Sequence, residues 1–241
     1  MDAADARQRA KVKYVAAARR CARFAGMPAR APGRGQRIRH WVHTLPLVYD
    51  WRALTELDVP WWTYRASAAV DAWLRARHEP VRAFEYGAGA STFWLARRVA
   101  EVHSVEHDRT FAASLAPALT AHVAASLHVV PAVPASHPAV PSAKEGHRGL
   151  DFANYVAAID EVPGDFDLIV IDGRAREACL GAALGRLRDD GLIVFDNSLR
   201  SRYRAAIRTA GLRERRYFGL TPTLPYPEQT SLLTRRQGSR S

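Results

Sequence analysis

The sequence predicts an α/β protein in which helices cover both faces of a doubly wound, mostly parallel sheet. From residue 80 onward, short apolar runs alternate with helical stretches, which is the order of elements in a parallel sheet. The first of these runs ends in a glycine-rich turn that leads directly into a helix. Two later extended runs, separated by a proline-rich loop, predict an antiparallel pair at one edge of the sheet.

The individual elements follow from the spacing of apolar residues. Strands are expected near 81–86, 101–106, 126–132, 166–172 and 191–196. Helices are expected near 65–77, 91–99, 108–122, 151–160 and 175–188. Ser198 is expected to cap a last helix that stops at Gly211. The antiparallel pair is expected at 215–219 and 230–235, and residues 133–150 are expected to form a loop.

The chain divides into three segments by composition. Residues 1–40 hold eleven lysines and arginines against two aspartates, a net charge of +9, so the remaining 201 residues carry only +2 of the total +11. We predict a basic N-terminal arm over 1–40, with a helix at 8–25. Residues 41–79 contain five tryptophans, four of them within 41–64, and are predicted to be a helical segment that packs on or caps the core. Residues 80–241 are predicted to form the main domain.

Composition also excludes several classes of protein. Because the positive charge is concentrated in the arm, a nucleic-acid interface across the whole fold is not supported. No apolar run approaches the ~18 residues that span a bilayer and no signal peptide opens the chain, so we expect a cytoplasmic protein. Cys21 and Cys179 lie far apart, which excludes a disulfide scaffold or a zinc ribbon. The oligomeric state stays open, with a homodimer as one alternative.

The glycine turn indicates a nucleoside ligand. Gly87 and Gly89 allow a tight turn and close approach of a ligand to the start of a helix. Glu106 ends the next predicted strand, where an acid can accept hydrogen bonds from ribose hydroxyls. Ser91 replaces the third glycine of dinucleotide folds, and Glu85 adds a negative charge that favours a ligand with an ammonium group. The alternative is a tight structural turn with an acid on the surface.

The string EYGAGASTFWLA, followed by VHSVEHD, resembles the cofactor-binding half of Rossmann-like S-adenosylmethionine-dependent methyltransferases, over about residues 80–235. The resemblance implies that Glu85, Gly87 and Gly89 line the methionine part of the cofactor, and that Glu106 binds its ribose. The full implied cofactor set is Glu85, Tyr86, Gly87, Ala88, Gly89, Ser91, Thr92, Glu106, His107 and Asp172. No residue is assigned to the adenine.

Three oxygen-bearing side chains follow two later strands. Asp172 ends the strand in FDLIVIDG, and Asp196 and Asn197 end the strand in GLIVFDNS. The carboxyl ends of neighbouring parallel strands meet at one edge, so we expect these three side chains to form the catalytic site. Two carboxylates and an amide suit Mg²⁺, which would activate an acceptor hydroxyl for in-line methyl transfer. The alternatives are a cofactor or substrate contact for Asp172 and helix capping for Asp196 and Asn197.

This spacing is similar to that of the metal-dependent catechol, caffeoyl-coenzyme A and sugar O-methyltransferases. The catechol-type enzymes have a lysine three residues after the first metal-binding aspartate, where this chain has Ala175. Arg174 and Arg176 flank that position and form either a clamp for a carboxylate or phosphate of the acceptor or a solvated helical turn. The resemblance implies O-methylation of a small-molecule or saccharide hydroxyl, with Mg²⁺ as a candidate cofactor.

Other interpretations of the same residues stay open. The fold also suits an N-methyltransferase, an RNA methyltransferase that uses the basic arm, or a scaffold protein that binds the cofactor without catalysis. Neither a [DNS]-P-P-[YF] motif nor a Pro-Cys nucleophile motif is present, which counts against methylation of nucleic acid. The aromatic side chains at 61–64 form either a lid or ordinary packing, and Lys144 and His147 lie in a loop that could close over a substrate.

Overall fold

The computed structural model describes residues 31–236 except 49, 143 and 145. The predicted helix at 8–25, Cys21 and most of the predicted basic arm therefore lie outside the described residues. Within the described part, no helix is long and apolar enough to cross a membrane.

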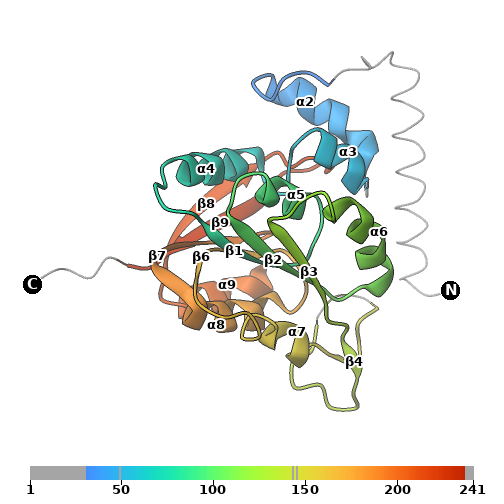
Figure 1. Cartoon of the computed structure of the whole chain (residues 1–241), viewed down its shortest axis with the longest axis vertical. Helices are drawn as coiled ribbons and strands as arrows, with labels where there is room; N and C mark the ends of the chain where they lie inside the picture. Colours follow the sequence, from blue (N-terminus) through green and yellow to red (C-terminus); the bar gives the residue numbers. More distant parts are fainter. Residues whose placement is uncertain (1–30, 49, 143, 145, 237–241) are drawn as a thin grey trace, which may run out of the picture.

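A seven-stranded sheet lies at the centre of the described part (Figure 1). Its order is β3-β2-β1-β6-β7-β9-β8, in which the first five strands are parallel and the last two pairings are antiparallel. The strands are β1 (Arg82–Tyr86), β2 (Glu101–Glu106), β3 (Ala125–Val129), β6 (Phe166–Ile171), β7 (Leu187–Phe195), β8 (Arg213–Gly219) and β9 (Glu228–Thr234). The predicted fold class is confirmed, including the antiparallel pair at one edge.

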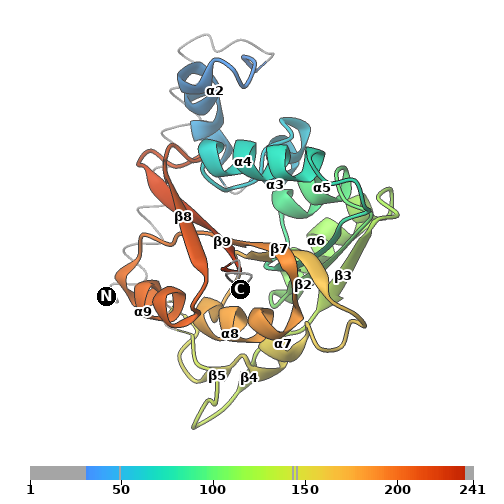
Figure 2. The same ribbon diagram turned by 90° about the vertical axis from the view of Figure 1, so that its left-hand side faces the viewer.

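Helices cover both faces of this sheet (Figure 2). One face carries α4 (Tyr64–Arg75) and α5 (Ala90–Ala96), and the other carries α7 (Ala153–Ala157), α8 (Arg176–Arg186) and α9 (Ser201–Thr209). The remaining helices are α2 (Arg37–Thr44), the short 3₁₀ helix η1 (Leu45–Leu47), α3 (Trp51–Glu56) and α6 (Arg109–Leu119). The architecture is therefore a three-layer arrangement of the kind that parallel sheets require.

The central strand β6 shows why the sheet is covered on both sides. All six of its residues are buried. Leu168 and Val170 pack in the cluster beneath α4 and α5, whereas Ile169 and Ile171 pack in the cluster beneath α7, α8 and α9. Successive side chains of a strand point to opposite faces, so an uninterrupted apolar run needs a helix layer on each side.

Two local expectations differ from the structure. The last helix begins at Ser201, its N-cap is Arg200, and no side chain caps it. Ser198 instead donates a hydrogen bond to the carbonyl oxygen of Gln229 and accepts one from the Gln229 amide, because β9 lies beside it. The 133–150 segment is also not entirely loop, since β4 (Val133–Pro134) and β5 (Leu150–Asp151) pair within it.

The ends of β1 and β6 approach each other at two glycines. Gly87 has a φ of +97°, in the left-handed region that favours glycine. A Cβ atom placed on Gly87 would lie 2.7 Å from both Cα and N of Gly173. Because both contacts are with backbone, neither can be relieved without moving the end of a strand.

We therefore expect Gly87→Ala to lower the free energy of unfolding by about 3 kcal/mol, since it adds both backbone strain and overpacking. Urea denaturation measures this change. Gly181→Ala is the control, because Gly181 is exposed in α8 and no atom lies within 4 Å of its Cβ position. That substitution is expected to stabilise the protein by about 0.5–1 kcal/mol. Equal effects of the two substitutions would contradict this account of the turn.

Candidate functional site

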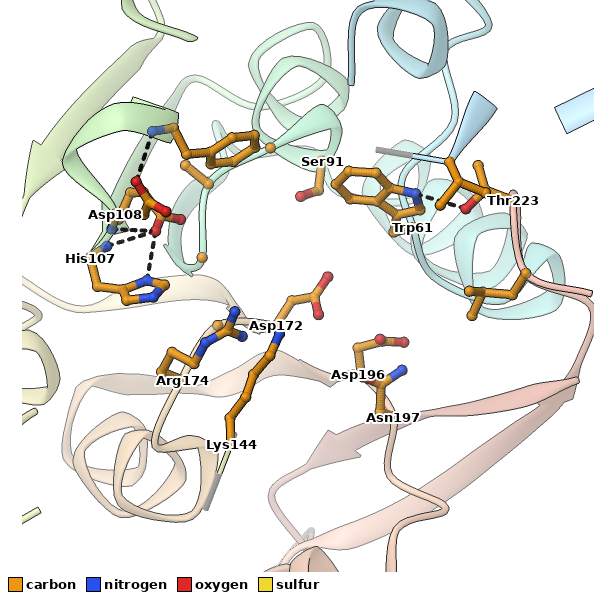
Figure 3. Close-up of a pocket in the computed structure, with 18 of the residues that line it drawn as sticks. Trp61, Ser91, His107, Asp108, Lys144, Asp172, Arg174, Asp196, Asn197 and Thr223 are labelled. Carbon is orange, nitrogen blue, oxygen red and sulfur yellow. Dashed lines mark hydrogen bonds and ion pairs between the residues drawn. The ribbon is translucent and has the colours of Figure 1, made fainter. Parts of the chain in front are cut away.

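The carboxyl ends of four parallel strands meet at one edge of the sheet. Tyr86 of β1 pairs with Val105 of β2 and with Ile171 of β6, and Ile171 pairs with Phe195 of β7. The residues that end or follow these strands therefore lie together, and a cavity of about 560 Å³ opens there (Figure 3). This volume is within the range of ~300–1,000 Å³ that is usual for ligand pockets.

Most of the predicted site residues line this cavity. They are Gly87, Ala88, Gly89, Ser91, Glu106, His107, Asp172, Asp196 and Asn197. Glu85, Tyr86 and Thr92 do not line it, because each is fully buried behind the glycine turn. The Tyr86 hydroxyl donates to the carbonyl oxygen of Val156, 2.6 Å away, and so points into the opposite layer of the fold.

Glu85 holds the glycine turn from behind. Its carboxylate accepts hydrogen bonds from the hydroxyls of Ser91, Thr92 and Ser104, the last at 2.6 Å. The Thr92 hydroxyl also accepts from the backbone N–H of Gly89 at 3.0 Å, which links Glu85 to the turn. Burial raises the pKa of Glu85 to about 7 despite these hydrogen bonds. The geometry therefore favours a supporting role for Glu85 over the direct ammonium contact expected from its charge.

Glu106 has a different arrangement, since it both holds the chain and faces the cavity. Its Oε1 accepts hydrogen bonds from the backbone N–H groups of His107 and Asp108, both at 2.8 Å. His107 Nδ1 lies 2.6 Å from the same oxygen. These contacts with described residues all use Oε1, and the second oxygen is available for the two adjacent hydroxyls of a ribose.

Asp172 and Asp196 are joined by a buried arginine. Arg176 is 6% exposed and donates to Asp172 Oδ1 at 2.7 Å, while its Nη1 lies 3.8 Å from Asp196 Oδ2. It also donates to the backbone carbonyl oxygens of residues 172, 173 and 196. The expectation of a solvated helical turn at Arg176 is therefore wrong. The four-residue spacing from Asp172 to Arg176 was the only sequence signal for this ion pair.

The two carboxylates are nevertheless only partly neutralised. Burial raises the pKa of Asp172, and the neighbouring arginines counteract this increase. Burial raises the pKa of Asp196 to about 7, and the negative charge of Asp172 contributes to the increase. Asp196 Oδ1 accepts a hydrogen bond from the Thr230 hydroxyl at 2.7 Å, so the side chain has a fixed orientation.

These contacts do not suit a magnesium site. The guanidinium of Arg176 already supplies the positive charge that two adjacent carboxylates need, and it engages an oxygen of Asp172. Asn197 lies next to Asp196 with a φ of +52°, and its amide donates to Glu228 at 3.2 Å. The structure gives the magnesium hypothesis no support.

Segments distant in the sequence complete the cavity wall. Trp61 stands beside Ser91 in Figure 3, and its indole N–H donates to the Thr223 hydroxyl at 3.2 Å. Leu224 and Tyr226, from the loop before β9, line the same side. Trp62 is instead buried beneath α4, and Tyr64 is buried against His40. Sequence reasoning did not identify the residues at 223–226, because nothing local distinguishes them from an ordinary loop.

The 133–150 segment reaches the opposite side of the cavity. Lys144 and His147 line it, and His147 Nε2 lies 3.3 Å from His107 Nε2. Figure 3 shows Lys144 and Arg174 reaching toward Asp172. The cavity therefore has an acidic floor at the strand ends, an aromatic and apolar wall at Trp61, and a basic wall at Arg174 and Lys144.

A family of known proteins matches the part of the chain that forms this site. Residues 84–198 match the family described as a methyltransferase domain. These residues are therefore similar to a methyltransferase domain. The match includes the glycine turn, Glu106, both aspartates and Arg176, and it supports S-adenosylmethionine as the cofactor of the domain. No curated protein matches the chain in sequence.

Several solved structures resemble the chain at a distance. A precorrin-6y C5,15-methyltransferase of Geobacter metallireducens is 15% identical with a TM-score of 0.47, over 70% of this chain and 87% of that one. An rRNA methylase of Streptococcus thermophilus is 11% identical with a TM-score of 0.48, over 70% and 95%. A Klebsiella pneumoniae protein assigned as an O-methyltransferase is 16% identical with a TM-score of 0.49, over 92% and 90%. These likenesses are too distant to select an acceptor.

The buried Glu85 leads to a prediction about stability and pH. Between pH ~4.5 and ~7 the unfolded chain has released the Glu85 proton while the folded protein retains it, so rising pH favours unfolding. The free energy of unfolding of the wild type is therefore expected to fall relative to that of Glu85→Gln by up to about 3 kcal/mol across this window. Urea denaturation at a series of pH values measures the difference.

The comparison isolates Glu85, because Asp196 contributes the same pH dependence to both proteins. Glu161→Gln is the matched control, since Glu161 is exposed and the substitution makes the same change of charge. The Glu161→Gln and wild-type curves are expected to run parallel. Parallel curves for Glu85→Gln and the wild type would show that burial does not perturb Glu85.

Proposed function

We propose that the protein transfers a methyl group from S-adenosylmethionine to a hydroxyl group of a small molecule or saccharide. The cofactor, when bound, supplies an electrophilic methyl group on its sulfur. The methionine part would lie over Gly87 and Gly89. A Cβ atom on Gly89 would lie 3.5 Å from the Trp61 ring, so a side chain here would occupy the space between the turn and Trp61. The ribose would bind Glu106, which leaves the cavity at Asp172 and Asp196 for the acceptor.

The observation that supports methyl transfer to a hydroxyl group is the raised pKa of Asp196 in the wall of the cavity. A neutral hydroxyl is a weak nucleophile, so its proton has to leave as the bond to the methyl carbon forms. A general base works best when its pKa is close to the operating pH. Asp196 lines the cavity, is held by Thr230, and has a pKa raised to about 7. It is therefore the side chain that we assign as the base, with Asp172 and Asn197 as neighbours that orient the acceptor.

Arg176 takes the electrostatic role that a metal ion would otherwise have. It stays charged at all working pH values, and it lies between the two carboxylates. We therefore propose methyl transfer without a divalent ion.

We also propose that residues 41–79 form a cap on the acceptor side of an S-adenosylmethionine-binding domain that starts near residue 80. Val48 and Trp61 from this segment line the cavity, while Trp51 and Trp62 anchor the segment in the core. An aromatic side chain above a polar floor suits an acceptor with one apolar face and several hydroxyls.

The cofactor assignment predicts that Glu106→Ala weakens S-adenosylmethionine binding by about 30-fold or more, because two hydrogen bonds to a charged acceptor are lost. Isothermal titration calorimetry measures the affinity. Glu101→Ala is the control, since Glu101 lies at the opposite end of the same strand and pairs with Arg82. The variant Glu101→Ala is expected to bind as the wild type does, and an unchanged affinity in Glu106→Ala would remove Glu106 from the site.

The base assignment predicts that Asp196→Asn lowers the rate of methyl transfer by about 100-fold or more while cofactor affinity changes less than about threefold. The rate of the wild type is expected to rise with pH up to about 7, and this rise should disappear in the variant. Release of S-adenosylhomocysteine in the presence of catechols and monosaccharides measures the rate. Asp189→Asn is the control, because Asp189 is fully exposed at the other end of β7.

Two results would contradict this assignment of the base. One is a wild-type pH profile that persists in Asp196→Asn. The other is a rate that EDTA abolishes and added Mg²⁺ restores, which would return Asp172, Asp196 and Asn197 to the role of metal ligands.

A further inference from the structure

A second cavity, of about 100 Å³, adjoins the first one. The two share wall residues, among them Arg174, Asn197 and Arg200. The second cavity lies where α8 and α9 begin, on the side of the fold that carries the ends of β6 and β7. One molecule could therefore extend from the first cavity, beside Asp196, into the second.

The wall of this second cavity is strongly basic. It is lined by Lys144, Arg174, Arg176, Arg200 and Arg202, whereas Glu177 is the only acidic residue among its described lining. The charge of Arg176 is taken up by Asp172 and Asp196, as described above. Three further arginines, Arg174, Arg200 and Arg202, therefore give this wall an excess of positive charge over the single carboxylate of Glu177.

Two of these arginines differ in their contacts, since Arg202 is held in place and Arg174 has an unsatisfied donor. Arg202 donates to the Tyr203 hydroxyl at 3.0 Å, and its guanidinium lies 4.7 Å from the centre of that ring. Arg174 Nε is buried and has no hydrogen-bond partner among the described residues. A buried donor of this kind can be satisfied by an acceptor from outside the chain, either water or an anion.

Backbone N–H groups add to the positive charge around the second cavity. The N-cap residues of α8 and α9 are Ala175 and Arg200, and both line the second cavity. Neither helix start is capped by a side chain, although the Tyr203 N–H in the first turn of α9 donates to the carbonyl oxygen of Arg200. Helix N-termini carry a positive partial charge, and two of them converge here with the arginine side chains.

We infer that this second cavity binds an anionic group of the methyl acceptor, a phosphate or a carboxylate, and that this contact positions the acceptor hydroxyl at Asp196. The inference rests on the proposed function, since it names the class of acceptor for the same site. Arginine forks bind two oxygens of either anion at once, which orients the acceptor as well as attracting it. The apolar wall at Trp61 would then contact the uncharged part of the same molecule.

Binding of inorganic phosphate tests the anion site without an acceptor. Calorimetry at constant ionic strength is expected to show saturable binding to the wild type, weakened about tenfold or more in the double variant Arg200→Gln with Arg202→Gln. The control is Arg208→Gln with Arg213→Gln, because these two arginines are exposed at the end of α9 and the start of β8. Absent binding, or equal weakening in the control, would overturn the inference.

S-adenosylmethionine binding to the same preparations separates this inference from the proposed function. Phosphate binding without cofactor binding would support the anion site and overturn the methyltransferase proposal. Cofactor binding without phosphate binding would overturn the anion site and leave the methyltransferase proposal intact. Because both double variants keep all residues of the glycine turn and the strand ends, their cofactor affinity also reports whether they fold.

Paired acceptors identify which anion is recognised. Glucose is compared with glucose 6-phosphate, and catechol with 3,4-dihydroxybenzoate. In at least one pair the charged member is expected to be methylated about tenfold faster or more, and this preference should disappear in the Arg200→Gln, Arg202→Gln variant but not in the control. The pair that shows the preference distinguishes phosphate from carboxylate. Equal rates within both pairs would overturn the inference.

Discussion

The site depends on one buried ion pair network, in which Arg176 lies between Asp172 and Asp196. Two carboxylates at the ends of adjacent strands would repel each other, and burying them without a partner would cost several kcal/mol each. Arg176 offsets that penalty and also donates to the backbone carbonyls at both strand ends. It therefore fixes the start of α8 against β6 and β7. Because its charge compensates the pair only in part, Asp196 keeps a raised pKa.

Glu85 is a second buried carboxylate that supports the site without lining the cavity. Its three hydroxyl partners tie β1 and β2 to the first turn of α5, so the glycine turn keeps its shape from behind. Glu106 is then free to face the cavity at the end of β2. In both halves of the site, one ionisable residue lies behind the strand ends and another lines the cavity. The supporting residues are as deeply buried as the hydrophobic core.

The cavity wall above the strand ends is formed by segments that lie outside the seven-stranded sheet. Trp61 precedes the first strand and Thr223 precedes the last, and a hydrogen bond joins them above the glycine turn. Lys144 and His147 come from the segment around β4 and β5. Such walls vary without disturbing the sheet, which is how one fold accommodates many acceptors. The arginines of the basic second cavity likewise lie at or next to helix starts rather than in strands.

Local patterns in the sequence were enough to predict the alternation of strands and helices and the edge pair. They also predicted the strand-end positions of the glycine turn, Glu106, Asp172 and Asp196, because parallel strands end at one edge of a sheet. The prediction that Ser198 caps a helix was wrong, because its hydroxyl donates to the carbonyl oxygen of Gln229 in β9 instead. The burial of Arg176 and Glu85 and the hydrogen bond between Trp61 and Thr223 became apparent only from the folded structure. Burial and pairing depend on contacts between segments far apart in the chain, which no local pattern records.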